Sequence, residues 1–513
     1  MSDTPKALLK RRLSRMKADQ QLRAPFVNEV YRLAMPQRQR VGQEKMTPMT
    51  EEEVQDLLDT TFAETADDFA SDMISMFTPA HEPWVTHEPT KALNKDQQRQ
   101  AAAQIKSAVD WLWDDVQESS YYDAADECFH DLVAGTMAMR MREYGAAQPL
   151  CYEAVPISEL LLDVGPDRAP DGRFTEGLCE KSHFAVNYGR YVDWKSLPGT
   201  LTTKFRNAKD DARFKVSDGV YRVWDKPGMT QWRRVVLLEG EIVYEKFYDE
   251  DGAEQFYVTR WRTEKRSAYG IGPGWWACAP QRVLVELAAL TLGGLHKTVD
   301  PSYAFSDPDG TANLEQGLAA GDYLQLGEGF DVKKLSGDGD LNAAFFQRED
   351  LRQLIKSALY QDRPEQRGDT PPTATQWADE SARTQQRWEI PRGKVYREWV
   401  IPIIRGHQWQ RTRHGIFPKI QIGADAVMLK PQSPQAKARS FDKVAKAERV
   451  LASAGSPALA QAAPLVIDGR KTLANIKSEL GDDIVAVRSQ QEIDQMAQQA
   501  AALAQQQGGL AQQ

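Results

Sequence analysis

The segment from residue 341 to residue 413 constrains the fold more than any other part of the sequence. Its first part places Leu351, Leu354, Ile355, Ala358 and Leu359 on one side of an α-helix, at the spacing of an apolar stripe. Residues 362–372 then contain three prolines and a glycine, which interrupt a helix. Taken alone, this pattern predicts an ordinary helical hairpin with a solvated loop.

A long second helix is expected at residues 374–417, after this loop. Thr373 and Gln376 have the spacing of a capping box at its start. The helix contains Pro391 and Pro402, and proline removes a backbone donor from a helix interior. We therefore expect a kink at each of these two prolines.

The rest of the chain predicts a mainly helical α+β protein. Helices are expected at residues 5–34, 47–77, 95–119, 121–141 and 278–297. Residues 150–257 contain short β-prone runs, such as 219–224 and 232–238, separated by turn residues. This spacing predicts a small, mostly antiparallel β region. The helix at 5–34 is basic, and a solvated surface is the expected place for its charged face.

Two amphipathic helices are predicted to flank a short β-containing excursion. The sequence Tyr-Gly-Ile-Gly-Pro-Gly at 269–274 is expected to form a turn before the first of them. Residues 299–340 are rich in Gly and Asp and carry two β-prone patches, 303–305 and 323–326. The second helix is the one at 342–360.

Composition excludes several classes of protein. The net charge of −9 argues against a broadly basic coat for nucleic acid, although it is compatible with a wall along which DNA slides. The four cysteines lack paired spacing, so neither a disulfide framework nor a zinc site is indicated. No run of 18 apolar residues occurs, and the N-terminus lacks a signal-peptide pattern. A soluble, non-secreted chain without a membrane segment is expected.

Common catalytic motifs are not found in the sequence. It contains no phosphate-binding G-x-x-x-x-G-K-[ST], no G-x-S-x-G and no H-E-x-x-H. We therefore expect no enzyme, no cofactor and no bound metal. An alternative that stays open is a Mg²⁺-dependent nuclease that uses Asp338, Asp340 and Asp350 as oxygen ligands.

The order of these parts resembles the portal, or head-to-tail connecting, proteins of short-tailed, T7-like bacteriophages. Local stretches also agree, namely Phe-Thr-Pro at 77–79 with Pro-Trp at 83–84, Asp-Leu-Val-Ala-Gly-Thr-Met-Ala at 131–138, Ala-Val-Pro-Ile-Ser-Glu-Leu at 154–160 and Ile-Pro-Ile-Ile at 401–404. The resemblance extends from about residue 20 to about residue 500.

The resemblance implies one subunit of a ring, typically of twelve, at a single vertex of the capsid. The virion would be assembled in the host cytoplasm with major capsid and scaffolding proteins. Double-stranded DNA would enter through the channel of the ring, driven by a terminase large subunit, and later leave through it. A tail adaptor protein would attach to the same ring, and no membrane is involved. A ring-forming adaptor or scaffold without a DNA channel is the structural alternative.

The resemblance also implies a role for each segment. These are a wing at 1–277, a first stem helix at 278–298, a clip at 299–341, a second stem helix at 342–360, a channel loop at 361–373, a kinked wing helix at 374–417 and a crown at 418–513. DNA contacts are expected from Lys356, Arg363, Gln366 and Arg367. Contacts to terminase or tail adaptor are expected from Tyr303, Phe305, Asp307 and Tyr323.

Overall fold

A computed structural model of the chain describes most residues between 5 and 361 and between 391 and 432. The gaps are 43–57, 82, 85, 90–94, 227–228, 251, 266, 300–302, 306–331, 335–340, 362–390, 392, 419–420, 423–424 and 427–428, and beyond 432 only residues 444, 447, 450–452, 472–473 and 476 are described. The chain divides into two compact units. The first comprises Met1–Pro83 and Leu93–Val427, and the second comprises Trp84–Ala92 and Met428–Gln513.

A five-stranded antiparallel sheet forms one part of the first unit, with the strand order β4-β5-β6-β7-β8. Its strands are β4 (Leu160–Val164), β5 (Pro170–Glu180), β6 (Arg213–Lys226), β7 (Met229–Leu238) and β8 (Glu241–Tyr248). Between β5 and β6 the chain forms α6 (Lys181–Tyr188), the short turn η1 (Gly189–Tyr191) and α7 (Gly199–Asn207). The predicted antiparallel β region is therefore present, with helices that the sequence reading did not anticipate.

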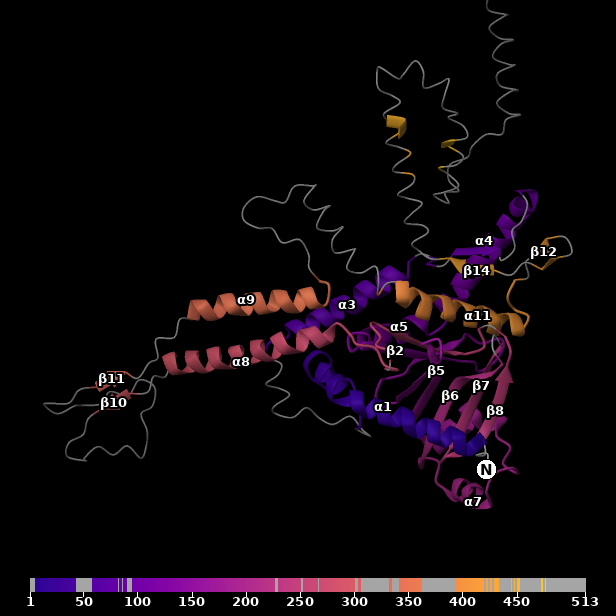
Figure 1. The fold of residues 1–513 in the computed structure, drawn as a ribbon, viewed down its shortest axis with the longest axis horizontal. Coiled ribbons are helices and arrows are strands. Elements are labelled where there is room, and N and C mark those ends of the chain that lie inside the picture. The colour runs from indigo at the N-terminus through magenta and orange to yellow at the C-terminus, as the bar shows by residue number, and fades with distance from the viewer. Residues whose placement is uncertain are drawn as a thin grey trace, which may run out of the picture. The chain divides into compact units, whose positions relative to one another are not determined.

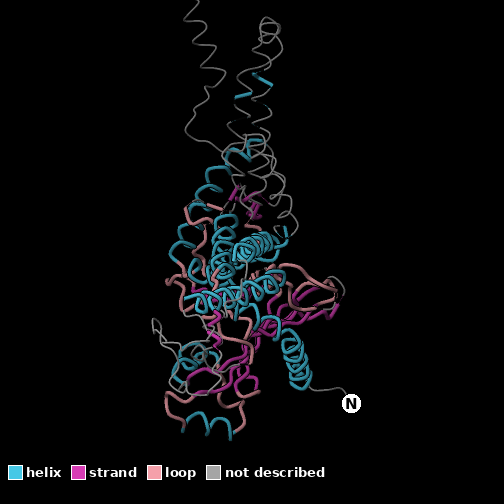
Figure 2. The backbone as a smooth tube through the Cα atoms, turned by 90° about the vertical axis from the view of Figure 1, so that its left-hand side faces the viewer, coloured by secondary structure: helices cyan, strands magenta, loops and turns pink. Residues whose placement is uncertain are grey.

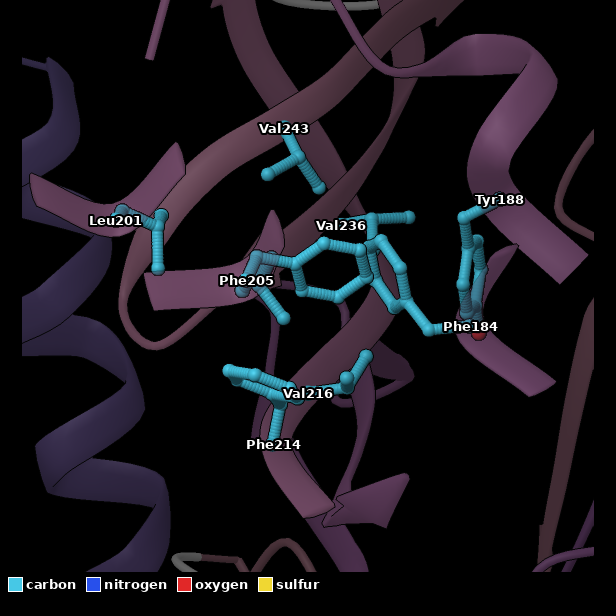
Figure 3. Packing of buried hydrophobic residues seen from close by; sticks show 9 residues of the cluster. Phe184, Tyr188, Leu201, Phe205, Phe214, Val216, Val236 and Val243 are labelled. Carbon is cyan, nitrogen blue, oxygen red and sulfur yellow. The ribbon is translucent and has the colours of Figure 1, made fainter. Parts of the chain in front are cut away.

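Both faces of this sheet are covered by apolar side chains. On one face, Phe184 of α6 and Phe205 of α7 pack with Val236 of β7, as Figure 3 shows. On the other face, Val235 of the same strand packs with Met16 of α1 (Pro5–Ala34). Because successive strand residues point to opposite faces, β7 contributes alternately to the two clusters.

The basic face of α1 meets carboxylates of the sheet. Arg12 and Arg15 both reach Asp163 of β4 at 2.7 Å. Lys17 reaches Glu176 of β5 at 3.0 Å, and Lys6 pairs with Glu241 of β8. These ion pairs fasten α1 to the strands, while Lys6, Arg15 and Lys17 keep 40%, 63% and 51% of their side chains in water, in agreement with the expected solvated face.

A second, three-stranded sheet has the order β3-β2-β9. Its central strand lies in the segment 121–141, where the sequence predicted one continuous helix, so that prediction is wrong for the second part of the segment. Its strands are β2 (Thr136–Arg142), β3 (Cys151–Ala154) and β9 (Phe256–Arg260), and the helix α5 ends at Asp131 (Tyr121–Asp131). Gly135, with φ of 111°, turns the chain out of the helix. The apolar run that follows is buried on both sides, and such a run cannot be told from a buried helix by its periodicity.

Helices form the other part of the first unit. They are α3 (Thr61–Phe77), α4 (Lys95–Glu118), α5, and α11 (Ile401–Arg413) with the preceding turn η2 (Tyr396–Val400). Trp399 is completely buried and donates its indole N–H to the Tyr121 hydroxyl at 3.2 Å. In Figure 2 the strands lie mainly in the lower half of this unit, with helices above, beside and beneath them. The helix expected at 47–77 begins only at Thr61, since residues 58–60 are not helical and 43–57 lie outside the described residues.

The prolines of the long second helix lie in helical backbone. Pro402 follows η2, a π turn in which the Ile401 N–H bonds to the Tyr396 carbonyl. A widened turn next to a proline accommodates its missing donor. The helix ends at Arg413, four residues before the expected end, because Gly415 has φ of +70° and the Ile416 N–H bonds back to Arg411 O at 3.1 Å.

The second unit contains one described strand pair. Strand β1 (Thr86–Pro89) runs antiparallel to β14 (Leu429–Gln432), so Thr86 pairs with Gln432 and Pro89 with Leu429. In the first unit, a further short pair joins β12 (Gln421–Ile422) to β13 (Asp425–Ala426).

Candidate assembly site on the helical arm

Two long helices project side by side from the first unit (Figure 1). They are α8 (Gly274–Val299) and α9 (Leu341–Ala358), and between them the chain forms the antiparallel strands β10 (Tyr303–Phe305) and β11 (Val332–Lys334). We call α8, β10, β11 and α9 the helical arm. The predicted helix–β–helix order is present, although the strand partner lies at 332–334 rather than at the β-prone patch 323–326, which is outside the described residues.

Close backbone packing determines where α8 begins. Ile271 bridges to Arg262, and the Gly274 N–H donates to Val133 O at 3.0 Å. A Cβ on Gly272 would lie 2.0 Å from Val133 O, so only glycine fits there. The segment at 269–274 is therefore the expected turn before a helix, and α8 starts four residues earlier than the sequence indicated.

Asp59 connects three helices at the base of the arm. Its carboxylate accepts hydrogen bonds from Arg352 of α9 at 2.7 Å and from the Thr61 backbone N–H of α3 at 3.0 Å. Its carbonyl accepts one from Gln281 of α8 at 2.7 Å. Burial alone would raise the Asp59 pKa, but the hydrogen bonds from Thr61 and Arg352 outweigh it and lower the pKa. Asp59 is therefore an ionised link between arm and body.

The end of α9 is also fixed to the body. Ile355 and Leu359 are fully buried, and the Gln361 amide donates to Asp72 of α3 at 2.9 Å. Tyr360 has φ of 65° and packs edge-on against Trp261, with the ring centroids 5.7 Å apart. The expected helix 342–360 thus ends at Ala358, where the left-handed Tyr360 redirects the chain.

An apolar groove of about 720 Å³ lies between α8, α9 and the body. Its lining is Trp261, Arg262, Gly272, Pro273, Trp276, Ala279, Pro280, Val283, Leu351, Leu354, Ser357, Ala358 and Tyr360. Trp276, Val283 and Leu354 expose 63%, 51% and 58% of their surface. The sequence placed Leu354 in one apolar stripe with Ile355. In the structure Ile355 is buried, whereas Leu354 lines this groove and is exposed to solvent.

A polar groove lies where α9 meets α3 and contains Lys356. It is lined by Leu58, Asp59, Thr60, Thr61, Glu64, Thr65, Asp68, Glu349, Arg352, Gln353, Lys356 and Gln361, with a volume of about 640 Å³. Lys356, predicted to contact DNA, is half-buried here among the carboxylates of α3.

The structure describes only some of the other predicted site residues. Tyr303 and Phe305 lie in β10, opposite Lys334 and Val332 of β11. Pro391 and Pro402 lie in helical backbone. Outside the described residues lie Arg363, Gln366, Arg367, Asp307 and Tyr323, as do Asp338 and Asp340 of the nuclease alternative. Asp350 of that alternative is exposed on α9.

Sequence reasoning missed Asp59, Trp261 and Tyr360. The Asp-Thr-Thr sequence at 59–61 is a helix-start signal that could have located the first of them. No local sequence pattern marks Trp261 or Tyr360, because the two residues are far apart in the sequence and come into contact only in the folded protein.

Within the described part of the chain, no three His, Cys, Asp or Glu side chains are grouped as metal ligands. Among the same residues, no helix is both long and apolar enough to cross a bilayer.

An exposed apolar arm on a folded α+β body is typical of a subunit that assembles with other chains. The chain belongs to the family of bacteriophage head to tail connecting proteins, which matches residues 6–386. Members of this family are named for a structural role at the junction of head and tail, and the protein is a component of a phage-type particle.

Solved structures give weaker comparisons. A chain from the neck of an empty gene transfer agent particle computed with C6 symmetry has 13% identity and a TM-score of 0.38, over 85% of this chain and 96% of that one. A chain from the virion of a native gene transfer agent particle has 14% identity and a TM-score of 0.36, over 88% and 98%. No curated protein matches the sequence.

Proposed function

We propose that the protein is a portal subunit, which forms a ring at one capsid vertex and conducts double-stranded DNA during packaging and ejection. Family membership supports this proposal, and the helical arm is the observation that carries it. Two long packed helices that end in a short strand pair give each subunit an elongated element, and repetition around an axis would turn these elements into a tube.

In this proposal the arm and its neighbours take the following roles. Helices α8 and α9 form the stem, residues 299–341 the clip, residues 361–373 the channel loop, and residues 418–513 the crown; residues 1–277 and 374–417 form the wing. The clip residues Tyr303, Phe305, Asp307 and Tyr323 contact a terminase large subunit during packaging and a tail adaptor later. Twelve subunits, together with major capsid and scaffolding proteins, complete the assembly in the host cytoplasm.

A few cationic and polar side chains contact the DNA in this arrangement. Arg363, Gln366 and Arg367 from the loop, with Lys356, would meet phosphates, which carry no sequence information. A net charge of −9 per subunit keeps the rest of the ring from adhering to DNA. A conduit that holds DNA weakly is suited to transport of any sequence.

Negative-stain electron microscopy of the purified full-length protein tests the proposal. Rings with an axial opening wide enough to admit a DNA duplex are expected, since a passage has to admit its cargo. A protein that stays monomeric at every concentration and salt condition overturns it. Closed rings too narrow for a duplex favour the adaptor or scaffold role instead.

A cleavage assay examines the nuclease alternative. Linear DNA is incubated with the protein and Mg²⁺, beside an Asp338→Ala, Asp340→Ala double variant. Cleavage that the double variant abolishes would contradict a purely structural role. Intact DNA in both samples agrees with the portal.

A further inference from the structure

Helix α1 carries a concentration of positive charge that contrasts with the rest of the chain. Residues 5–23 contain seven Lys or Arg and one Asp, in a sequence whose net charge is −9. A basic helix on an acidic protein is typical of a surface that meets an anionic partner. The charged face of α1 therefore has to be examined for what its own protein leaves unbalanced.

The ion pairs that fasten α1 to the five-stranded sheet balance only part of this charge. Two carboxylates of the strands each accept two cations, namely Arg12 and Arg15 on Asp163, and Lys17 and Lys215 on Glu176. One carboxylate balances one of its two cations. Each of the two sites therefore keeps a positive charge that a further anion could take up.

The side of α1 that faces away from the sheet forms one line of exposed residues. Leu8, Arg15 and Leu22 follow one another every seven residues, or about two turns, and Arg11 and Ala18 lie between them. All five are exposed, Leu8 by 52% and Leu22 by 80%. In Figure 1 α1 lies in front of the strands, with no described helix or strand drawn over it. We call these five residues the outer line.

The outer line has the pattern on which two helices pack side by side. Its residues recur at the alternating three- and four-residue spacing of a coiled-coil seam. Apolar side chains lie at its two ends, about 21 Å apart, with arginines between them. The small Ala18 leaves room for a second backbone. A partner that covers this line needs apolar groups at both ends and anionic groups in the middle.

Other anionic partners satisfy only part of this pattern. The phosphates of duplex DNA would meet the arginines but would place Leu8 and Leu22 against a charged backbone. An anionic membrane would receive only these two leucines, because the apolar side of α1 is buried against the sheet, where Met16 is 1% exposed.

We propose that the outer line is a docking surface for an acidic amphipathic helix of another protein. Apolar side chains of that helix cover Leu8 and Leu22. Its carboxylates take up the positive charge that is left at Arg15 and Lys17. The inference goes beyond the portal function and does not require a ring.

Binding of a designed peptide to the full-length protein tests the surface. The probe is a fluorescein-labelled helical peptide with Leu at two positions fourteen residues apart, as Leu8 and Leu22 are, and Glu along the same side between them. We expect saturable binding, measured by fluorescence anisotropy, that weakens as salt is added, because salt screens exposed charges. Absence of saturable binding overturns the proposal.

Two altered peptides separate the apolar and the charged contribution. One has Ser in place of both Leu, and the other has Gln in place of every Glu. Each is expected to bind at least about fivefold more weakly, the loss typical of side chains that contribute to an interface. A serine peptide that binds as tightly as the first would show attraction by charge alone, and would contradict a docked helix.

Two variants of the protein identify the residues on α1. Leu8→Ser with Leu22→Ser removes the apolar ends. Arg15→Gln with Lys17→Gln removes two positive charges and still leaves one cation on each carboxylate. Each variant is expected to bind the first peptide at least about fivefold more weakly. Wild-type affinity in either variant overturns the proposal. Circular dichroism checks the fold, and Leu22→Ser or Arg15→Gln alone replaces a pair that does not fold.

Matched control variants come from other elements. Leu178→Ser with Val186→Ser changes apolar side chains of β5 and α6 that are 51% and 70% exposed. Arg397→Gln with Arg413→Gln removes two exposed cations from η2 and α11. Both are expected to bind the peptide as the wild type does, and an equal loss in them would show that the peptide does not bind at α1.

DNA and membranes are tested in the same way. A short labelled DNA duplex, and vesicles of phosphatidylserine and phosphatidylcholine, are mixed with the wild type and with the Arg15→Gln, Lys17→Gln variant. Binding that is tighter than that of the peptide and is lost in the variant would identify a nucleic acid or a membrane as the partner and overturn the helix. Ring formation bears on the portal function alone, so the two proposals can fail separately.

Discussion

The carboxylate of Asp59 lies 2.7 Å from the guanidinium of Arg352, and this contact joins the start of α3 to the middle of α9. Arg348 approaches the same carboxylate at 3.7 Å. The Asp59 side chain is almost completely buried, whereas about a third of Arg352 stays in water. A buried anion with two cations from one helix determines how that helix lies on the body.

Replacement of Asp59 by Ala is expected to lower the free energy of unfolding by about 2–3 kcal/mol. The change leaves Arg352 without its partner and removes the bond to the Thr61 N–H. Chemical denaturation at pH 7 measures the loss. Glu349→Ala is the control, since Glu349 is exposed and lies 3.8 Å from Arg352, and its effect should stay below about 0.5 kcal/mol. Equal losses in the two variants would contradict the role of Asp59.

The same carboxylate predicts a loss of stability in acid. The Asp59 pKa is lowered in the folded protein. Its contribution to the free energy of unfolding is therefore fully present at pH values above the ordinary pKa of about 3.9, and it is lost as the pH falls through the lower pKa of the folded state. Asp59→Asn cannot titrate. The difference in unfolding free energy between wild type and Asp59→Asn should therefore be constant from pH 7 to pH 5 and shrink below pH 4.

His407 is expected to make the protein less stable as the pH falls below about 6.5. It is fully buried, and burial lowers its pKa although Asp115 opposes the shift. The neutral ring accepts from the Tyr152 hydroxyl at 2.7 Å and donates to Asp115 at 2.5 Å. The unfolded chain takes up a proton at its ordinary pKa, so unfolding becomes easier by at most about 1.4 kcal/mol per pH unit.

Urea unfolding of wild type and His407→Gln between pH 7.5 and pH 5.5 measures this slope. The variant should lack the His407 part of the slope, whatever its absolute stability. His183→Gln on α6 is the substitution control, because it makes the same side-chain change at an exposed position. A wild-type slope that survives in His407→Gln would mean that another group titrates.

Gly135→Ala is expected to cost about 3 kcal/mol, because strain and overpacking coincide at this position. Its φ is +111°, and an added Cβ would lie 2.3 Å from the Gly272 nitrogen. Gly199→Ala is the matched control, since nothing lies within 4 Å of its Cβ position, and a change within about 1 kcal/mol is expected. Thermal unfolding compares the two. Similar melting temperatures would show that the backbone at Gly135 relaxes.

Arg363→Ala with Arg367→Ala is expected to leave ring assembly intact and to lower the amount of DNA packaged or retained in particles. Phosphate contacts would be lost while the arm is untouched. Quantification of particle DNA is the measurement. Arg363→Lys with Arg367→Lys keeps the charges and should package DNA normally. Loss of the ring in the alanine variant would instead identify the loop as an assembly contact.

Periodic patterns predicted most of the fold. The helices at 5–34 and 95–119, the antiparallel region and the helix–β–helix order all follow from local spacing, which is why they are present in the structure. The failure at 136–142 has a physical reason, because a strand buried on both faces shows no alternation. The link at Asp59 could not be read from the sequence, since its partner Arg352 is 293 residues away. The predicted DNA contacts at 363–367 stay a prediction.

The attachment of the arm has a mechanical consequence. Helix α8 has 26 residues, so at 1.5 Å per residue it is about 39 Å long. Its bond to Asp59 is made by Gln281, near the body end. A tilt of roughly 5° about that point would move the far end by about 2 Å over the 18 residues from Gln281 to Val299 (299 − 281 = 18). A small rearrangement at the Asp59 carbonyl would therefore be amplified at the distant strand pair.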